Sequence, residues 1–351
     1  MRRFSGEITT DRGENPGGCD ELRHLLFPFY KTWPIKAWSK LRWHLNESLA
    51  PRLPRLNARR GKVTVIDRLG APGDALLTAI VIHNLKKRYP RLRVNCITPH
   101  PELLQLEPAI DSLNEPETFY SLDSSYWDLV CRKDSSINVV AHSLTKVGID
   151  SCEYKSRFYL SKEESEWGQS QTTGLRRPLF SVNTVSKEPV KTWPKDNWQT
   201  LLPFLQEIGD VIQLGDEREL ELVGVKRFAG KLTMRQSATV LAQCDLHIGP
   251  DSLLMHIANG VDVPAVILMG GSRTEQSLGY PENINLTVSP DCSPCWIHQG
   301  YEACMHEVKC MSALKVEAVL EAVHHLSNIS SQPYSSEQKA RKQETATAIQ
   351  P

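Results

Sequence analysis

Short apolar runs alternate with amphipathic segments from about residue 62 onward. Residues 63–66 form an apolar, β-branched run, which is typical of a buried parallel strand. A glycine-containing loop follows, and residues 74–88 carry apolar positions at helical spacing until Tyr89-Pro90 ends the pattern. Residues 93–98 are expected to form the next strand. This order predicts one strand–helix–strand unit, with shorter α/β units between residues 100 and 165.

A second series of the same kind begins near Pro178. It predicts strands at 179–183, 211–214, 246–248 and 263–269, and helices around 198–205, 234–243 and 251–259. Strands that alternate with helices at this spacing form parallel sheets with helices on both faces. We therefore expect an α/β fold with two domains facing each other across a cleft. The N-terminal domain is expected over residues 61–170 and the C-terminal domain over residues 171–326.

Both ends of the chain differ from this pattern. Residues 1–60 contain 12 Lys and Arg against 6 Asp and Glu, and apolar residues recur at helical spacing between Pro34 and Ala50. Such a basic amphipathic helix suits the surface of an anionic membrane; alternatively, it packs on its own domain with its basic residues in solvent. Residues 327–351 are rich in Ser, Gln and Thr, and we expect a disordered tail there.

The composition is that of an ordinary globular protein and argues against several other classes. The 351 residues include 41 Lys and Arg and 41 Asp and Glu, so no net positive charge is available to hold nucleic acid. No apolar stretch approaches the ~20 residues that span a bilayer, and no apolar signal segment follows the N-terminus. The odd number of cysteines, nine, favours free thiols in a reducing compartment. We expect a cytoplasmic protein, either free or bound to the cytoplasmic face of the inner membrane.

The loop between the first strand and the first helix carries the first candidate chemistry. It contains Arg68, Gly70, Gly73 and Asp74, and it lies at the carboxyl end of a strand, where open α/β sheets bind ligands. The glycines allow tight turns and close approach of a ligand. Asp74 is suited to cap the helix, but a cap alone does not require two glycines. Asp74 is therefore a candidate catalytic carboxylate, and Arg68, Gly70 and Gly73 are candidates for an acceptor or phosphate loop.

Two later loops are candidate anion-binding sites. Lys191 precedes a helix whose first amides attract negative charge, although a solvated surface lysine gives the same pattern. Asp251 and Ser252 follow a buried strand and either bind a diphosphate or cap a helix, and His256 one turn later is more often structural than a ligand. The dinucleotide fingerprint and the P-loop motif are both absent, which argues against an oxidoreductase and a P-loop nucleotidase.

Four cysteines crowd into one segment near the C-terminus. Cys292, Cys295, Cys304 and Cys310 have the spacing C-x₂-C-x₈-C-x₅-C, which can close a tetrahedral thiolate site. Iron and zinc both accept four thiolates, so the spacing does not choose between them. Partly buried thiols or a local disulfide remain the alternative. Any metal ion held here would be structural, because a filled shell leaves no open position for a substrate.

Several separated motifs, taken in order, resemble those of glycosyltransferase family 9, the ADP-heptose:lipopolysaccharide heptosyltransferases. They are Gly70-Ala-Pro-Gly-Asp-Ala-Leu-Leu-Thr, Lys191-Thr-Trp-Pro-Lys-Asp-Asn-Trp, Gly230-Lys-Leu-Thr, Asp251-Ser with His256, and Cys292-Ser-Pro-Cys-Trp, and the fit runs from about residue 62 to 325. The resemblance implies the GT-B fold, which has two Rossmann-like domains. It also implies an inverting transfer of heptose from ADP-heptose without a catalytic metal.

The resemblance further implies roles for individual residues. Asp74 matches the family's proposed catalytic base, and Lys191 matches the lysine that holds the donor diphosphate. The other donor-binding candidates are Thr184, Glu219, Asp251, Ser252 and His256. The four-cysteine segment resembles that of members that heptosylate autotransporter proteins, where it binds iron.

The acceptor stays open at this point. The resemblance implies an inner-core sugar of lipopolysaccharide, with a serine of an autotransporter protein as the alternative. Two residues depart from the family pattern: Ala79 replaces a common proline, and Leu253 stands where a small residue is usual. Leu253 is the best support for a third possibility, a nucleotide-sugar-binding protein that has lost catalysis.

Overall fold

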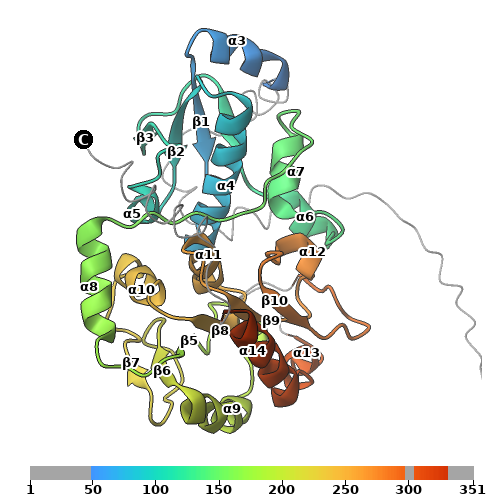
Figure 1. The fold of residues 1–351 in the computed structure, drawn as a ribbon. Coiled ribbons are helices and arrows are strands. Elements are labelled where there is room, and N and C mark those ends of the chain that lie inside the picture. Colours follow the sequence, from blue (N-terminus) through green and yellow to red (C-terminus); the bar gives the residue numbers. More distant parts are fainter. Residues whose placement is uncertain (1–48, 297–303, 331–351) are drawn as a thin grey trace, which may run out of the picture. The chain divides into compact units, whose positions relative to one another are not determined.

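The computed structural model of the chain describes residues 49–296 and 304–330, and all of these belong to one compact unit that begins at Leu45 (Figure 1). Two parallel sheets organise this unit, one in each half of the sequence. The prediction of an α/β fold with two Rossmann-like halves is therefore confirmed. The amphipathic helix predicted after Pro34 lies outside the described residues except for its last positions, and so does the chain after Ser330.

The N-terminal half contains a four-stranded sheet with the order β3-β2-β1-β4. Its strands are β1 (Lys62–Ile66), β2 (Arg93–Ile97), β3 (Ser112–Leu113) and β4 (Ser121–Asp123), and its helices are α3 (Leu53–Ala58), α4 (Pro72–Arg88), α5 (Pro101–Leu104), α6 (Trp127–Arg132) and α7 (Val139–Thr145). All strand pairs are parallel. Val63 and Val65 of the predicted strand are fully buried because β1 is an inner strand.

The C-terminal half contains a six-stranded parallel sheet with the order β10-β9-β8-β5-β6-β7. Its strands are β5 (Leu179–Val182), β6 (Asp210–Gln213), β7 (Lys226–Arg227), β8 (Leu246–Pro250), β9 (Ala265–Gly270) and β10 (Ile284–Thr287), and its helices are α8 (Lys162–Thr172), α9 (Lys195–Ile208), α10 (Met234–Leu241), α11 (Leu253–Gly260), α12 (Glu275–Leu278), α13 (Lys309–Ser312) and α14 (Val316–Ser330). The predicted helix before Gly209 is α9, and Gly209 caps it. The helix expected from Asp251 begins two residues later, at Leu253.

One hydrophobic core runs through both halves of this unit. It includes Leu49 and Leu53, which precede the first strand, together with residues of α4 and α11. The two helices contact each other directly: a Cβ added to Gly73 would lie 2.9 Å from Cδ2 of His256. Gly73 is therefore needed for close packing of the two halves at the place where both carry candidate site residues.

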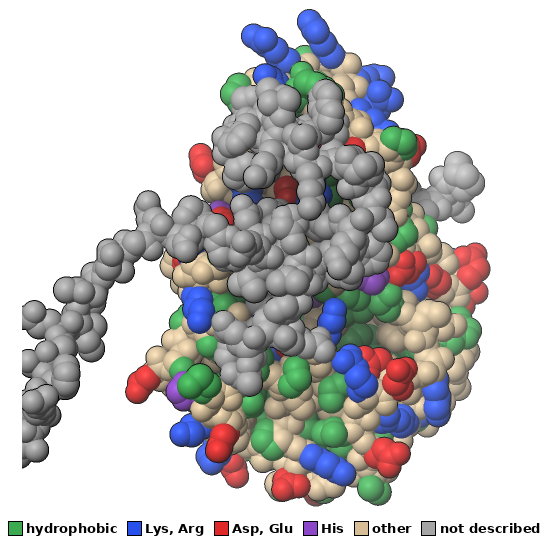
Figure 2. Space-filling model, turned by 180° about the vertical axis from the view of Figure 1, so that it is seen from behind, with side chains coloured by type: hydrophobic (Ala, Val, Ile, Leu, Met, Phe, Trp, Pro, Cys, Tyr) green, Lys and Arg blue, Asp and Glu red, His purple; other side chains and the backbone are tan. Residues whose placement is uncertain are grey.

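The structure also bears on two expectations from the sequence, a contact with a membrane surface and free cysteine thiols. Lys and Arg side chains gather over the end of the unit where α3 lies (Figure 2), and exposed residues there include Arg55, Arg59, Arg60, Arg88, Arg91 and Arg93. Among the described helices, none is both long and apolar enough to cross a membrane. Among the described cysteines, the expectation of free thiols holds for Cys96, Cys152, Cys244, Cys292, Cys304 and Cys310, but it is wrong for Cys131, which is disulfide-bonded.

Candidate active site

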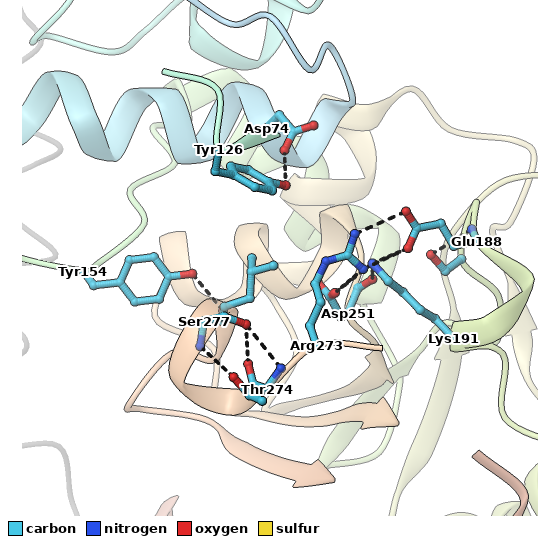
Figure 3. Close-up of polar contacts among 11 residues, drawn as sticks. Asp74, Tyr126, Tyr154, Glu188, Lys191, Asp251, Arg273, Thr274 and Ser277 are labelled. Carbon is cyan, nitrogen blue, oxygen red and sulfur yellow. Dashed lines mark hydrogen bonds and ion pairs between the residues drawn. The ribbon is translucent and has the colours of Figure 1, made fainter. Parts of the chain in front are cut away.

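Asp74 lies in the first turn of α4, just beyond the carboxyl end of β1, as the sequence predicted. Its Oδ1 accepts a hydrogen bond of 2.9 Å from the hydroxyl of Tyr126, which precedes α6 (Figure 3). Its Oδ2 accepts a bond of 3.3 Å from the amide of Ala71, so the carboxylate also closes the first turn of its own helix. Asp74 keeps partial solvent access, whereas Tyr126 is buried. The capping and the catalytic interpretations of Asp74 are therefore compatible.

A second carboxylate, Asp67, shapes the loop that leads to Asp74. It accepts the amide of Gly70 at 3.0 Å and the hydroxyl of Thr98 at 2.9 Å, and it is buried. Gly70 has a φ of +73°, a conformation that costs glycine little and other residues more. Arg68 pairs with Asp123 at 3.0 Å, at the carboxyl end of the neighbouring strand β4. Arg68 and Gly70 thus fix the loop, and any acceptor contact by them stays a prediction.

Burial raises the pKa of both carboxylates, Asp74 and Asp67, and so makes them weaker acids than usual. Loss of solvation, followed by the negative charge of Asp67, raises the pKa of Asp74 to about 7, and the bonds from Tyr126 and Ala71 oppose this rise. Burial also raises the pKa of Asp67 to about 6. A carboxylate that titrates near pH 7 is suited to act as a general base at neutral pH.

Four charged side chains form a closed network at the carboxyl ends of β5, β8 and β9. Lys191 Nζ contacts Asp251 Oδ2 at 2.8 Å and Glu188 Oε2 at 3.0 Å, and Arg273 Nη1 contacts the same Glu188 oxygen at 3.0 Å. Arg273 Nη1 also lies 3.9 Å from Asp251 Oδ2. All but Glu188 are buried, with Glu188 nearly so. We call Glu188, Lys191, Asp251 and Arg273 the ion-pair square (Figure 3).

The square sets the charge at the start of α11. Burial alone would raise the pKa of Asp251, but Lys191 and Arg273 hold it below its usual range. Ser252 follows Asp251, and its Oγ is buried with no hydrogen-bond partner among the described residues. A buried hydroxyl without a partner at the start of a helix is available for a ligand.

Thr184 and Glu219, both donor-binding candidates, contact each other. The Thr184 hydroxyl donates to Glu219 Oε2 at 2.6 Å, and the Thr184 amide donates to the same oxygen. Burial raises the pKa of Glu219 to about 6, while the bonds from Thr184 act in the opposite direction. This pair joins the ends of β5 and β6. Asn183 reaches the other Glu219 oxygen at 3.5 Å, and a backbone hydrogen bond from Val185 also favours the ionised carboxylate.

His256 is engaged by an aromatic neighbour. Its Nδ1 lies 2.8 Å from the hydroxyl of Tyr280, whose ring stacks on Tyr154 at 4.6 Å between centroids. Burial lowers the pKa of His256 to about 4, so the imidazole is neutral at pH 7. These contacts match the structural interpretation of His256; its donor contact stays a prediction. Leu253, in the first turn of α11, packs against the hydrophobic core.

The cysteine segment lies next to the end of β9. Val308 donates its amide to Cys304 Sγ at 3.4 Å, and a Cβ on Gly271 would lie 2.9 Å from Cβ of Cys310. Burial raises the pKa of Cys310, and the neighbouring Cys295 and Cys304 raise it further. In the described part of the chain, no three His, Cys, Asp or Glu side chains are arranged to hold a metal ion. The metal site therefore stays a prediction.

Four residues of these clusters were not among the sequence candidates: Asp67, Tyr126, Glu188 and Arg273. Asp67 and Arg273 each follow a buried apolar strand within a few residues, and a charge at that place was the available signal. Nothing local distinguishes Tyr126 or Glu188, because the partner of each comes from a distant part of the chain.

Comparisons with known proteins agree with this architecture. Residues 134–306 match the sequence model of glycosyltransferase family 9 (heptosyltransferase), a range that includes Lys191 and Asp251 but begins after Asp74. No curated protein matches the sequence. A family 9 glycosyltransferase from Veillonella parvula DSM 2008 is similar in structure, with a TM-score of 0.58, 16% identity, and coverage of 76% of this chain and 96% of that one.

Two further solved structures are similar at the level of the fold. The ADP-heptose lipopolysaccharide heptosyltransferase II of E. coli has a TM-score of 0.52 and 15% identity, and the match covers 76% of this chain and 98% of that one. The iron-containing dodecameric glycosyltransferase TibC of enterotoxigenic E. coli H10407 has a TM-score of 0.60 and 16% identity, with 76% of each chain covered. TibC is also known in complex with ADP-D-β-D-heptose. These structures show the fold of this chain, and the sequence match over residues 134–306 is to the same family, glycosyltransferase family 9.

Proposed function

We propose that the protein is an inverting heptosyltransferase that moves heptose from ADP-heptose to a hydroxyl of an inner-core sugar of lipopolysaccharide. The observation that carries this proposal is a carboxylate with a pKa of about 7, Asp74, in the same unit as the buried ion-pair square that contains Lys191. Both stand at the carboxyl ends of inner parallel strands, where α/β sheets bind ligands.

In this mechanism the acceptor hydroxyl attacks the anomeric carbon of the heptose. Asp74 takes the hydroxyl proton, the new glycosidic C–O bond forms, and the bond from the anomeric carbon to the diphosphate oxygen breaks. The electron pair of that bond leaves with ADP. A single displacement inverts the configuration at the anomeric carbon.

The leaving diphosphate gains negative charge as the bond breaks, so groups that meet it in the transition state accelerate the reaction. Lys191 supplies a full positive charge, and the first amides of α11 with the Ser252 hydroxyl supply hydrogen-bond donors. The adenosine would extend toward Thr184 and Glu219, where the carboxylate can accept a ribose hydroxyl.

The acceptor is the finer part of the proposal, and its test compares two substrates. The purified chain is incubated with ADP-heptose and either truncated inner-core lipopolysaccharide or an autotransporter passenger domain, and products are weighed by mass spectrometry. We expect one added heptose on the lipopolysaccharide. Heptose on the passenger domain alone would reject the lipid-linked acceptor in favour of a protein serine.

Asp74→Asn is the matched control in this assay. It keeps the size of the side chain and an oxygen that can accept from Tyr126, but it cannot take a proton. Removal of a general base lowers turnover by about 10²–10⁴-fold. Wild-type activity in Asp74→Asn would reject the assigned base, and no transfer by the wild-type chain to either acceptor would favour a nucleotide-sugar-binding protein without catalysis.

We also propose that Cys292, Cys295, Cys304 and Cys310 bind one structural iron or zinc ion. The support is chemical: four thiols lie in one segment, and Cys304 Sγ accepts a backbone amide, a contact that stabilises thiolates. Elemental analysis of protein purified without chelator should give about one metal ion per chain. Four freely titratable thiols in folded, metal-free protein would reject this site, and Cys152→Ser, at a free thiol outside the segment, is the control.

A further inference from the structure

Every member of the ion-pair square touches charges of the opposite sign on two sides. Glu188 Oε2 receives both Lys191 Nζ and Arg273 Nη1 at 3.0 Å, and Arg273 Nη2 reaches the other Glu188 oxygen at 3.4 Å. Two cations thus converge on one carboxylate in a forked arrangement. Arginine binds carboxylates and phosphates through this same fork.

The ring of Trp296 also contacts the Arg273 guanidinium and helps to hold it in this position. The Arg273 Cζ lies 5.1 Å from the centre of the Trp296 ring, a distance typical of a cation–π contact. The Trp296 amide in turn donates to the Ser272 carbonyl at 2.9 Å. Arg273 is 4% exposed. The side chain is therefore fixed in place before any ligand arrives, and a fixed cation loses little entropy on binding an anion.

The square lies where the donor diphosphate is expected. Glu188 and Lys191 follow β5, Asp251 follows β8 and Arg273 follows β9, and these three strands are neighbours in the sheet. Figure 3 shows the Arg273 and Lys191 side chains pointing toward Glu188 and Asp251. The unpartnered Ser252 hydroxyl directly follows Asp251 in the chain.

We propose that Arg273 is a second diphosphate-binding cation and that Glu188 holds the place of the phosphate until the donor binds. This inference deepens the proposed function and rests on it for the identity of the donor. Two cations and two carboxylates leave the square neutral without ligand. When a diphosphate enters, the Glu188 carboxylate leaves Lys191 and Arg273, and phosphate oxygens take its bonds. Asp251 stays and keeps Lys191 oriented.

This arrangement has an energetic reason. Two buried cations without counter-ions would destabilise the folded protein, because buried charge is costly unless it is paired. Glu188 removes that cost in the free protein, and it also competes with the donor. The carboxylate is the less buried of the two acidic members, with 15% side-chain exposure against 5% for Asp251, so it is the one that can move out.

The test measures anion affinity by isothermal titration calorimetry on the full chain, with ADP and inorganic pyrophosphate as probes. Glu188→Gln removes the competing charge but keeps the shape, so both probes should bind roughly tenfold more tightly. Arg273→Gln removes the fork, and both probes should bind roughly ten- to a hundredfold more weakly. Glu163→Gln and Arg132→Gln make the same charge changes at exposed positions and should leave both affinities unchanged.

Each outcome decides the matter. Weaker pyrophosphate binding in Glu188→Gln would overturn the placeholder role, because it would show that Glu188 only shapes the site. Unchanged affinity in folded Arg273→Gln would overturn the assignment of Arg273. If Arg273→Gln shows no cooperative unfolding transition, and is therefore not folded, the affinities of Glu188→Gln decide the test. Wild-type protein that binds pyrophosphate but not ADP would reject the proposed donor and retain the anion site. Binding of neither probe would reject both.

Discussion

The acidity of Asp74 can be moved in either direction by its two neighbours, and this gives the sharpest test of its role. Tyr126 donates a hydrogen bond of 2.9 Å to Asp74 and favours the ionised form. Asp67 places a like charge nearby and favours the protonated form. Tyr126→Phe should therefore raise the pKa of Asp74 from about 7, and Asp67→Asn should lower it. Because a general base must be ionised, the rise of kcat/KM with pH should shift in the same direction in each variant.

The size of the shift follows from the contact. A hydrogen bond to a charged group contributes roughly 1.5–3 kcal/mol, and one pKa unit corresponds to about 1.4 kcal/mol, which gives one to two units. Asp74 keeps partial solvent access, so water replaces part of the lost bond and we expect about one unit. The ionised fraction at pH 7 then falls from about one half to about one tenth, a roughly fivefold loss of rate that disappears near pH 9.

The assay measures initial rates of ADP release from ADP-heptose in the presence of the acceptor, between pH 5.5 and 9.5 (chosen to bracket the limb by about two units on either side). Tyr120→Phe is the control, since Tyr120 packs against Phe119 and Arg52 instead of Asp74. The reasoning is refuted if the rise of kcat/KM with pH occurs at the same pH in wild-type protein, Tyr126→Phe and Asp67→Asn. A uniform loss of rate at every pH in Tyr126→Phe would show that Tyr126 positions a substrate and does not tune the base.

Two further predictions concern stability and the surface. Because the folded-state pKa of Asp74 lies near 7, above the usual value of 3.8, ionising Asp74 opposes folding progressively as the pH rises from about 4 to 7. Asp74→Asn should thus raise the unfolding temperature at pH 8 and leave it nearly unchanged at pH 4; an equal effect at both values would contradict the raised pKa. We propose that the exposed arginines beside α3 also contact an anionic membrane, so Arg59→Glu with Arg91→Glu should reduce sedimentation with phosphatidylglycerol vesicles but not with phosphatidylcholine vesicles. Equal sedimentation of wild-type and variant protein would reject this contact.

The inner strands and long helices could be predicted because each carries its own pattern. β1, β5, β8 and β9 are apolar runs buried on both faces, and α9 has a regular apolar stripe that stops at Gly209. β3, β4 and β7 span only two or three residues, so no periodicity can appear in them. Their pairing is fixed by the neighbouring strands, which is information that no short window of sequence contains.

The site residues also divide into those that local sequence indicates and those that it does not. Asp74, Lys191 and Asp251 stand at strand–helix junctions, and local sequence marks such junctions with glycine, charge and capping residues. Tyr126 and Glu188 become meaningful only through contacts made across the fold: Tyr126 meets a residue 52 positions earlier, and Glu188 meets one 85 positions later. Sequence reasoning therefore finds the elements that present a site more readily than the side chains that tune it.

Arg273 links the two chemical tasks of the site. Its positive charge lowers the pKa of Asp74, although burial and Asp67 outweigh it, and it also acts on Tyr126. In the free protein Glu188 and Asp251 largely neutralise Arg273, which limits this effect. A bound diphosphate brings more negative charge than the single carboxylate it replaces, so the net potential at Asp74 becomes more negative and its pKa rises. Donor binding therefore makes the ionised Asp74 carboxylate a stronger proton acceptor but lowers its ionised fraction at pH 7, and release of ADP reverses both effects. The exchange of charges in the ion-pair square and the protonation of Asp74 are thus coupled, without any movement of Asp74 itself.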